Sequence, residues 1–278
     1  MRVILSRKGF DTATGGCPSP IVAGRPLSLP IPTKMPTRFR YGALAAGVGQ
    51  MVEQLTRGRH ARQSFCHLDP DLDARTLPRA AGWRGALGQV AAAQGHLRNR
   101  AVGPGDLFLF WGLFRPATFQ GHWGFDGAPE HRIFGWLQVD CVLEVGTDAR
   151  GSLKRFPWLA DHPHLQSGWP ASNTVYVARE ALNLGGEEWA CPGWGLFARG
   201  LRLTAPDSEK PSRWAVPDWL NPNRGGCGMT YHPAERWTAD GHVQAAARGQ
   251  EFIADIGERD DAREWVRGLF AEALVAPV

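Results

Sequence analysis

The positions of hydrophobic residues along the chain predict three well-defined strands and three weaker ones. A short apolar run with β-branched residues covers 2–5 and ends in a polar loop. The run 107–114 follows the turn signal Gly103-Pro104-Gly105-Asp106 and is apolar throughout, which is typical of a strand buried on both faces. The segment 132–145 is the third strong strand. Weaker strands are expected at 173–178, 196–204 and 251–255.

Apolar spacings of three and four residues predict three helices. The first covers 41–56 and the second covers 82–98. The third, 262–274, is amphipathic and closes the chain. The apolar stripe of the first consists of Leu44, Val48, Met51 and Leu55, and that of the second of Trp83, Leu87, Val90 and Leu97.

These elements do not alternate regularly as strand, helix, strand. The order favours an α+β fold with a mixed or antiparallel sheet over a doubly wound fold. No sharp change of composition divides the chain, so we expect a single domain over 2–276. The 34 glycines and 21 prolines among 278 residues predict long loops around the helices, and the longest of them covers 6–36.

Charge is distributed unevenly along the chain. Residues 1–100 contain 15 Lys and Arg against 5 acidic residues, whereas the whole chain has a net charge of only +4. Such asymmetry indicates a polyanionic partner. A content of 43% hydrophobic and 21% charged residues supports a packed core and argues against a coiled coil, a collagen or a membrane-spanning bundle.

Cysteine usage and the chain's first residues predict a cytoplasmic protein. The five cysteines are scattered without a CxxC pair, which is typical of a reduced compartment. MRVILSRKGF contains too short an apolar run for a signal peptide, and no segment has the length of a membrane span.

Several common site motifs are missing from the sequence. We find no phosphate-binding loop, no GxGxxG after a strand and no HExxH. The segment beginning at Asp69 superficially resembles an EF-hand loop. It has Ala74 where that loop needs Gly and Ala80 where it needs Glu, so this calcium site is excluded.

The segment SRKGFD directly after the first strand is the first candidate for catalysis. It places Ser6, Arg7, Lys8 and Asp11 in one glycine-containing loop at a strand end. Lys8 could serve as a base or nucleophile. The alternative is a solvated loop in which Arg7 and Asp11 form a surface pair.

The second candidate is the segment His67-Leu68-Asp69. On an extended backbone both side chains point to the same face, and Asp71 and Asp73 continue the row. The row could supply a His–Asp acid–base pair or bind a divalent ion. The alternative is a turn at Asp69-Pro70 with the later carboxylates flanking a short helix. His162 and His164 form a His-x-His pair typical of metal sites, but the sequence does not locate a third ligand.

Aromatic residues with interleaved cations surround the two strongest strands. Flat rings beside Arg side chains suit an unstacked base, so Trp111 and Arg115 are candidate base-binding residues. Most of these rings must also fill the core, and at most two or three should line a pocket. The set comprises Trp111, Phe114, Trp123, Phe125 and Trp136 with Arg115, His122 and Arg132.

Taken together, SRKGFD, GGCPSPI, LSLPIP, HLDPDL and the late GQEFI resemble the nucleotide modification associated domain family of the third type. The resemblance extends from Arg2 to the C-terminal helix. It implies a protein that modifies DNA bases or nucleotides in phage and bacterial modification systems, and it strengthens the candidacy of Ser6, Arg7, Lys8, Asp11, Ser19, His67 and Asp69. Cys17 departs from the aliphatic residue that we associate with its position, so we do not assign it as a nucleophile.

A weaker similarity, over about forty residues, links the chain to PUA-like barrels, which include the ASCH and EVE domains and hold a modified or flipped base. It is carried by Gly105–Phe110 and Ile133–Trp136. Convergent turn chemistry explains this match equally well.

The sequence therefore favours an enzyme that modifies a base in DNA or in a nucleotide. Lys8, Asp11, His67 and Asp69 are the expected catalytic residues, and Ser6, Arg7, Ser19, Trp111 and Arg115 are expected to bind the substrate. The alternatives are a non-catalytic reader of modified bases and a metal-dependent nuclease of a restriction system. The expected partners are nucleic acid or nucleotide and the other enzymes of a modification pathway, with no membrane. The sequence identifies no cofactor and assigns no metal ligands.

Overall fold

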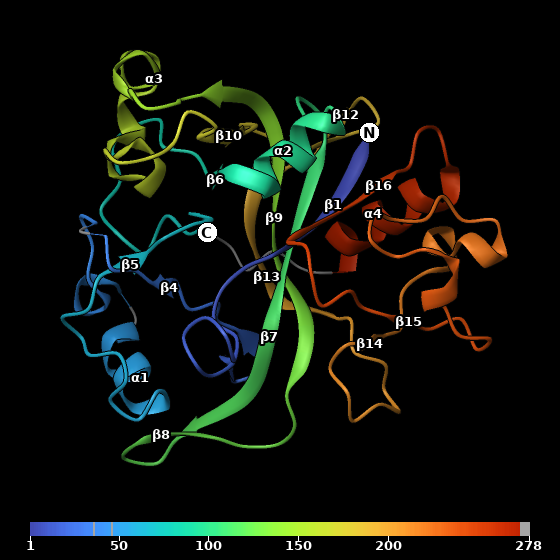
Figure 1. The fold of residues 1–278 in the computed structure, drawn as a ribbon, viewed down its shortest axis with the longest axis horizontal. Helices are drawn as coiled ribbons and strands as arrows, with labels where there is room; N and C mark the ends of the chain where they lie inside the picture. The colour runs from blue at the N-terminus through green and yellow to red at the C-terminus, as the bar shows by residue number, and fades with distance from the viewer. Residues whose placement is uncertain (36, 46, 273–278) are drawn as a thin grey trace.

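A computed structural model describes residues 1–35, 37–45 and 47–272 as a large mixed sheet with helices on its two faces (Figure 1). Ten strands belong to this sheet, and six of them follow the order β16-β1-β7-β9-β10-β6. These six are β16 (Glu251–Asp255), β1 (Arg2–Arg7), β7 (Leu107–Phe119), β9 (Glu130–Glu144), β10 (Thr174–Ala178) and β6 (Ala86–Gln89). The other four are β2 (Ser19–Val22), β3 (Arg25–Pro26), β8 (Trp123–Phe125) and β13 (Trp194–Arg202).

Three two-stranded pairs, four α-helices and six short 3-10 helices complete the described elements. The pairs join β4 (Ile31–Pro32) with β5 (Cys66–His67), β11 (Asn183–Leu184) with β12 (Glu187–Glu188), and β14 (Arg213–Trp214) with β15 (Val243–Gln244). The helices are α1 (Val48–Leu55), α2 (Ala91–Asn99), α3 (Arg150–Arg155) and α4 (Asp260–Glu272). None of the helices in the described ranges has the length and apolar character that crossing a bilayer requires.

The alternation of side chains in β1 explains how both faces of the sheet become buried. Val3 and Leu5 join one core cluster together with residues of α4, and Ile4 joins another together with Leu97 of α2. Each of these three β1 side chains is no more than 4% exposed. A strand buried on both faces reads as a continuous apolar run, which is why β1 and β7 could be recognised in the sequence.

The mixed character of the sheet arises around β7. β1 and β2 both run parallel to β7, whereas β9 and β8 run antiparallel to it. This confirms the predicted α+β class and mixed sheet. The sheet remains open, and no closed barrel forms among the described residues. The two segments that resembled a PUA-like barrel are instead neighbouring strands of this open sheet, with Phe110 opposite Gly135.

Two predicted helices are wrong in part. The segment 82–98 contains the strand β6 before α2 begins, because Leu87 pairs with Tyr176 of β10 and is fully buried there. The segment 41–56 contains a 3-10 turn, Tyr41–Ala43, before α1 begins at Val48. Gly47 adopts a φ of 69° at the start of α1, a conformation that interrupts a right-handed helix. The predicted end of the last helix, and the end of the predicted domain at 276, lie outside the described residues.

Candidate active site

A polar cavity of about 240 Å³ opens where β1 ends, and it gathers residues from six separate parts of the chain. Its lining includes Lys8, Asp11, His67, Asp69, Gln89 and His164. The pairing of β1 with β16 in the sheet and the short β4–β5 pair place these segments around one space. We call this space the polar cavity.

Lys8 enters the polar cavity as one half of a buried ion pair. Its Nζ lies 3.3 Å from Oε1 of Glu251, and the two side chains are 10% and 1% exposed. Gln89 donates a hydrogen bond from its side-chain amide to the same carboxylate oxygen. The ladder pairs Ser6 with Glu251, so the register of β1 on β16 determines this contact.

His67 and Asp69 lie close to two further histidines, His162 and His164. Nε2 of His67 lies 3.9 Å from Oδ2 of Asp69, and Nε2 of His164 lies 4.0 Å from the same oxygen. Nε2 of His162 lies 3.3 Å from the other oxygen, Oδ1. The Asp69 side chain is only 5% exposed, and its Oδ1 also accepts a 2.7 Å hydrogen bond from the backbone of Gly88.

Burial and neighbouring charges determine the ionisation of this cluster. Burial lowers the pKa of His164 to about 4 and also lowers the pKa of His67 below its usual value. Burial alone would raise the pKa of Asp69, but the close approach of His162 together with His164 and Lys8 holds this pKa well below its ordinary range. The cavity therefore presents the carboxylate of Asp69 beside the neutral imidazoles of His67 and His164 at neutral pH.

Trp169 provides the flat aromatic surface of the polar cavity. Its ring stacks on His164, with centroids 4.1 Å apart and planes 9° apart, and it also contacts His67. The ring is half-buried. Sequence reasoning did not select Trp169, although it lies only five residues after His164.

The expected site residues divide into those that reach the polar cavity and those that do not. Arg7, Lys8, Asp11, His67 and Asp69 all line it. Asp11 also forms a turn, since its Oδ1 accepts hydrogen bonds from the backbone of Ala13 and Thr14. Asp11 thus stabilises its own loop, and among the described residues it forms no ion pair with Arg7, which was the expected alternative.

The remaining candidates lie elsewhere. Trp111 is 1% exposed in the core, stacked against Phe252, so it cannot receive a base. Ser6 is fully buried within β1, and Ser19 uses its hydroxyl to accept a 3.1 Å hydrogen bond from the backbone of Leu29. Arg115 donates to the carbonyl of Gly127 and lies outside the polar cavity.

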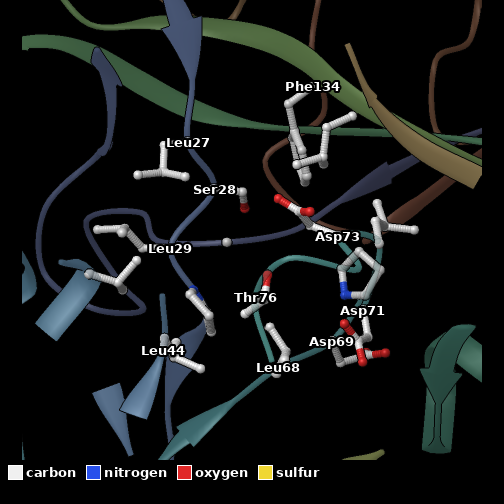
Figure 2. A pocket seen from close by; sticks show the side chains of 16 residues that line it. Leu27, Ser28, Leu29, Leu44, Leu68, Asp69, Asp71, Asp73, Thr76 and Phe134 are labelled. Carbon is white, nitrogen blue, oxygen red and sulfur yellow. The ribbon is translucent and has the colours of Figure 1, made fainter. Parts of the chain in front are cut away.

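The expected row of carboxylates does not assemble. Asp71 forms a bidentate pair with Arg79, and Asp73 forms a pair with Arg75. Figure 2 shows the adjoining apolar pocket, in which the carboxylate of Asp73 is turned toward Ser28 and away from Asp69 and Asp71. Only Asp69 of the three carboxylates reaches the polar cavity, so the row cannot hold a divalent ion between its carboxylates.

Besides Trp169, sequence reasoning did not assign three residues to this site, namely Glu251, Gln89 and His164. Glu251 is part of the quoted motif GQEFI, but nothing local connects it with Lys8. Gln89 falls inside a segment predicted to be helical. His164 was noted as part of a His-x-His pair, and its third partner, Asp69, lies 95 positions away.

The fold and the cavity define a mixed-sheet α+β protein with a histidine- and carboxylate-lined site. The family model of nucleotide modification associated domain 3 matches residues 2–255. The chain belongs to this family, which confirms the resemblance found in the sequence, and the family's description associates it with nucleotide modification. No curated protein and no solved structure matches the chain.

Proposed function

We propose that this protein is an enzyme that modifies a base, in DNA or in a nucleotide, inside the polar cavity. The observation that carries the proposal is the meeting of Lys8, His67 and Asp69 around one cavity in a member of a nucleotide modification family. A volume of about 240 Å³ is slightly below that of pockets for whole drug-sized ligands, ~300–1,000 Å³, and suits a single base.

Each residue of the polar cavity has a role in this proposal that follows from its chemistry. Chemistry on a base inside a duplex is sterically blocked, so a base of DNA would have to swing out to reach the cavity. The ring of Trp169 would support it by stacking, which is worth ~1–3 kcal/mol per base. His67 beside the carboxylate of Asp69 would accept or donate a proton. Arg7 would bind phosphate.

Lys8 acts in this proposal as a fixed positive charge rather than as a nucleophile. Its amine is held 3.3 Å from the buried carboxylate of Glu251. A fixed cation stabilises negative charge that develops on a reacting base or on its leaving group. We also place the protein in the cytoplasm, since its five cysteines are free. Its family suggests that it works with other enzymes of a nucleotide modification pathway.

Mass spectrometry of nucleosides tests the proposal. DNA and the nucleotide pool of native host cells would be digested and compared between cells that lack the gene and cells with the wild-type gene, with Asp69→Asn, or with Asp126→Asn. Asp126 is an exposed carboxylate in the turn after β8 and serves as the matched control. We expect a nucleoside mass that is present with the wild type and the control and absent with Asp69→Asn.

Identical nucleoside profiles with and without the gene, in both DNA and the pool, would contradict the proposal. Retained and base-dependent DNA binding in that case would favour the non-catalytic reader. Cleaved DNA in place of a new mass would favour the nuclease.

A further inference from the structure

One oxygen of Asp69 and two imidazole nitrogens face one another without forming hydrogen bonds. The ligand atoms of His67, Asp69 and His164 all lie within 4.8 Å of one another. The distances from Oδ2 of Asp69 to the two nitrogens, 3.9 Å and 4.0 Å, are too long for hydrogen bonds. Two ligands bound at about 2.0–2.2 Å to one metal ion are separated by roughly 3–4 Å, depending on the angle between them.

The tautomer of His164 shows which of its ring nitrogens can bind a metal ion. Its Nδ1 lies 2.7 Å from Oδ1 of Asn173. The Asn173 amide nitrogen donates to the carbonyls of His164 and Gly146, so its oxygen is the atom that faces the ring. Nδ1 must therefore carry the proton, and Nε2 directs a lone pair toward the carboxylate. Two electron-rich atoms that face each other at 4.0 Å are stabilised by a cation between them.

Asp69 is anchored in the way that a metal-binding carboxylate is anchored. Its Oδ1 accepts the backbone hydrogen of Gly88 and faces His162. His162 accepts the backbone hydrogen of His164 on Nδ1, so its own proton lies on Nε2, toward Asp69. No hydrogen bond from the described residues reaches Oδ2, which is left for another partner. In metal centres, the ligand atom that does not bind the metal is typically held by a hydrogen bond from a buried neighbour, as Oδ1 of Asp69 is here.

We propose that His67, Asp69 and His164 hold one divalent transition-metal ion through Nε2, Oδ2 and Nε2. Two imidazoles and one carboxylate suit Zn²⁺ or Fe²⁺ better than Mg²⁺ or Ca²⁺, which prefer oxygen ligands. Three protein ligands leave coordination positions open, and the polar cavity lies beside them. Those positions would take water or an oxygen or nitrogen atom of the substrate. The site is inferred from ligand geometry and does not depend on the proposed function. With the ion bound, His67 would act as a ligand, and metal-bound water would take over the proton transfer assigned to His67 above.

Metal binding by the purified full-length protein tests the inference without any assay of base modification. After treatment with a chelator, the protein would be titrated with Zn²⁺ alone, and anaerobically with Fe²⁺ alone, by calorimetry. We expect one equivalent to bind, and Mg²⁺ not to compete. His67→Ala and His164→Ala should each weaken binding by at least about 100-fold, since the loss of even a supporting residue costs 10–100-fold. His122→Ala, which removes an exposed histidine, should leave binding unchanged.

Thermal unfolding with and without Zn²⁺ provides a second measurement for variants that fold poorly. Zn²⁺ should raise the melting temperature of the wild type and of His122→Ala but not of the two ligand variants. Failure of the wild type to bind an equivalent of either ion below millimolar concentration would overturn the inference, as would equal binding by all variants. A modified nucleoside formed by a protein that binds no metal would overturn the metal site alone and leave the proposed function intact.

Discussion

At Gly88 the backbone of β6 passes directly against the imidazole ring of His164. A Cβ built on Gly88 would lie 2.1 Å from ring atoms of His164, so an alanine must displace the ring. We expect Gly88→Ala to lower the free energy of unfolding by ~1–3 kcal/mol through overpacking. It should also move His164 away from Asp69. Urea denaturation measures the first effect.

Gly95→Ala is the control for this substitution. Gly95 lies in α2, and a Cβ there would meet nothing within 4 Å. Alanine at this position should stabilise the protein by ~0.5–1 kcal/mol, because glycine loses more conformational entropy in a helix. A Gly88→Ala protein as stable as the wild type would show that His164 is not confined by β6.

Glu251 presents the second test at the residue scale. Glu251→Gln removes the negative charge but leaves the Lys8 ammonium in a nearly buried position. Breaking a buried ion pair by removing one partner costs ~3–5 kcal/mol, so the urea midpoint should fall strongly. Adding Lys8→Met to Glu251→Gln should recover part of that loss. A double variant that is less stable than Glu251→Gln alone would contradict a compensated pair.

At the scale of elements, His131 connects β9 with the β14–β15 pair. Trp214 of β14 donates its indole hydrogen to Nδ1 of His131 over 2.9 Å. Nδ1 therefore carries no proton, and the imidazole is neutral. Burial, together with the charge of Arg7, lowers the pKa of His131 to about 4. An unfolded chain has a histidine pKa of about 6.5, so it binds more protons than the folded protein between these two values.

Stability should therefore fall as the pH decreases from about 6.5 to 4, and the His131 contribution to this loss is roughly 3 kcal/mol. His131→Asn keeps an acceptor for Trp214 but cannot titrate in this range. We expect its free energy of unfolding to depend less steeply on pH than that of the wild type, whereas His122→Asn should change nothing. Equal slopes for all three proteins, measured by urea denaturation at each pH, would contradict the prediction.

At the scale of the whole molecule, the basic N-terminal part packs beside the polar cavity. Arg57, Arg59 and Arg62 are exposed in the segment after α1, and none forms an ion pair within the described ranges. Arg59 touches the loop that contains Asp11, because a Cβ on Gly16 would meet its guanidinium. We expect these three cations to bind phosphates of a nucleic acid.

Replacing Arg57, Arg59 and Arg62 together by Gln should therefore weaken DNA binding at low salt. Each phosphate contact that is lost should reduce the slope of log affinity against log salt by ~0.9 for duplex DNA. Fluorescence anisotropy with a labelled oligonucleotide, repeated over a series of salt concentrations, gives both quantities. The matched control replaces Arg199, Arg202 and Lys210 by Gln. These three cations are exposed and lie outside the basic segment 1–100. Equal losses in both triple variants, or a flat salt response of the wild type, would argue against a DNA-binding face at this position.

The sequence by itself determined the strands whose pattern is local. β1 and β7 contain continuous apolar runs, and β9 contains a long stretch of buried residues. Such patterns can be recognised without knowing the neighbouring strands. The family motifs likewise selected Lys8, His67 and Asp69. The tertiary structure alone decided that 86–89 pairs as a strand, because the partner that stabilises it, β10, is nearly ninety residues away. It also decided that Glu251, Gln89, His164 and Trp169 surround those motif residues, since contacts between distant segments depend on strand register rather than on local periodicity.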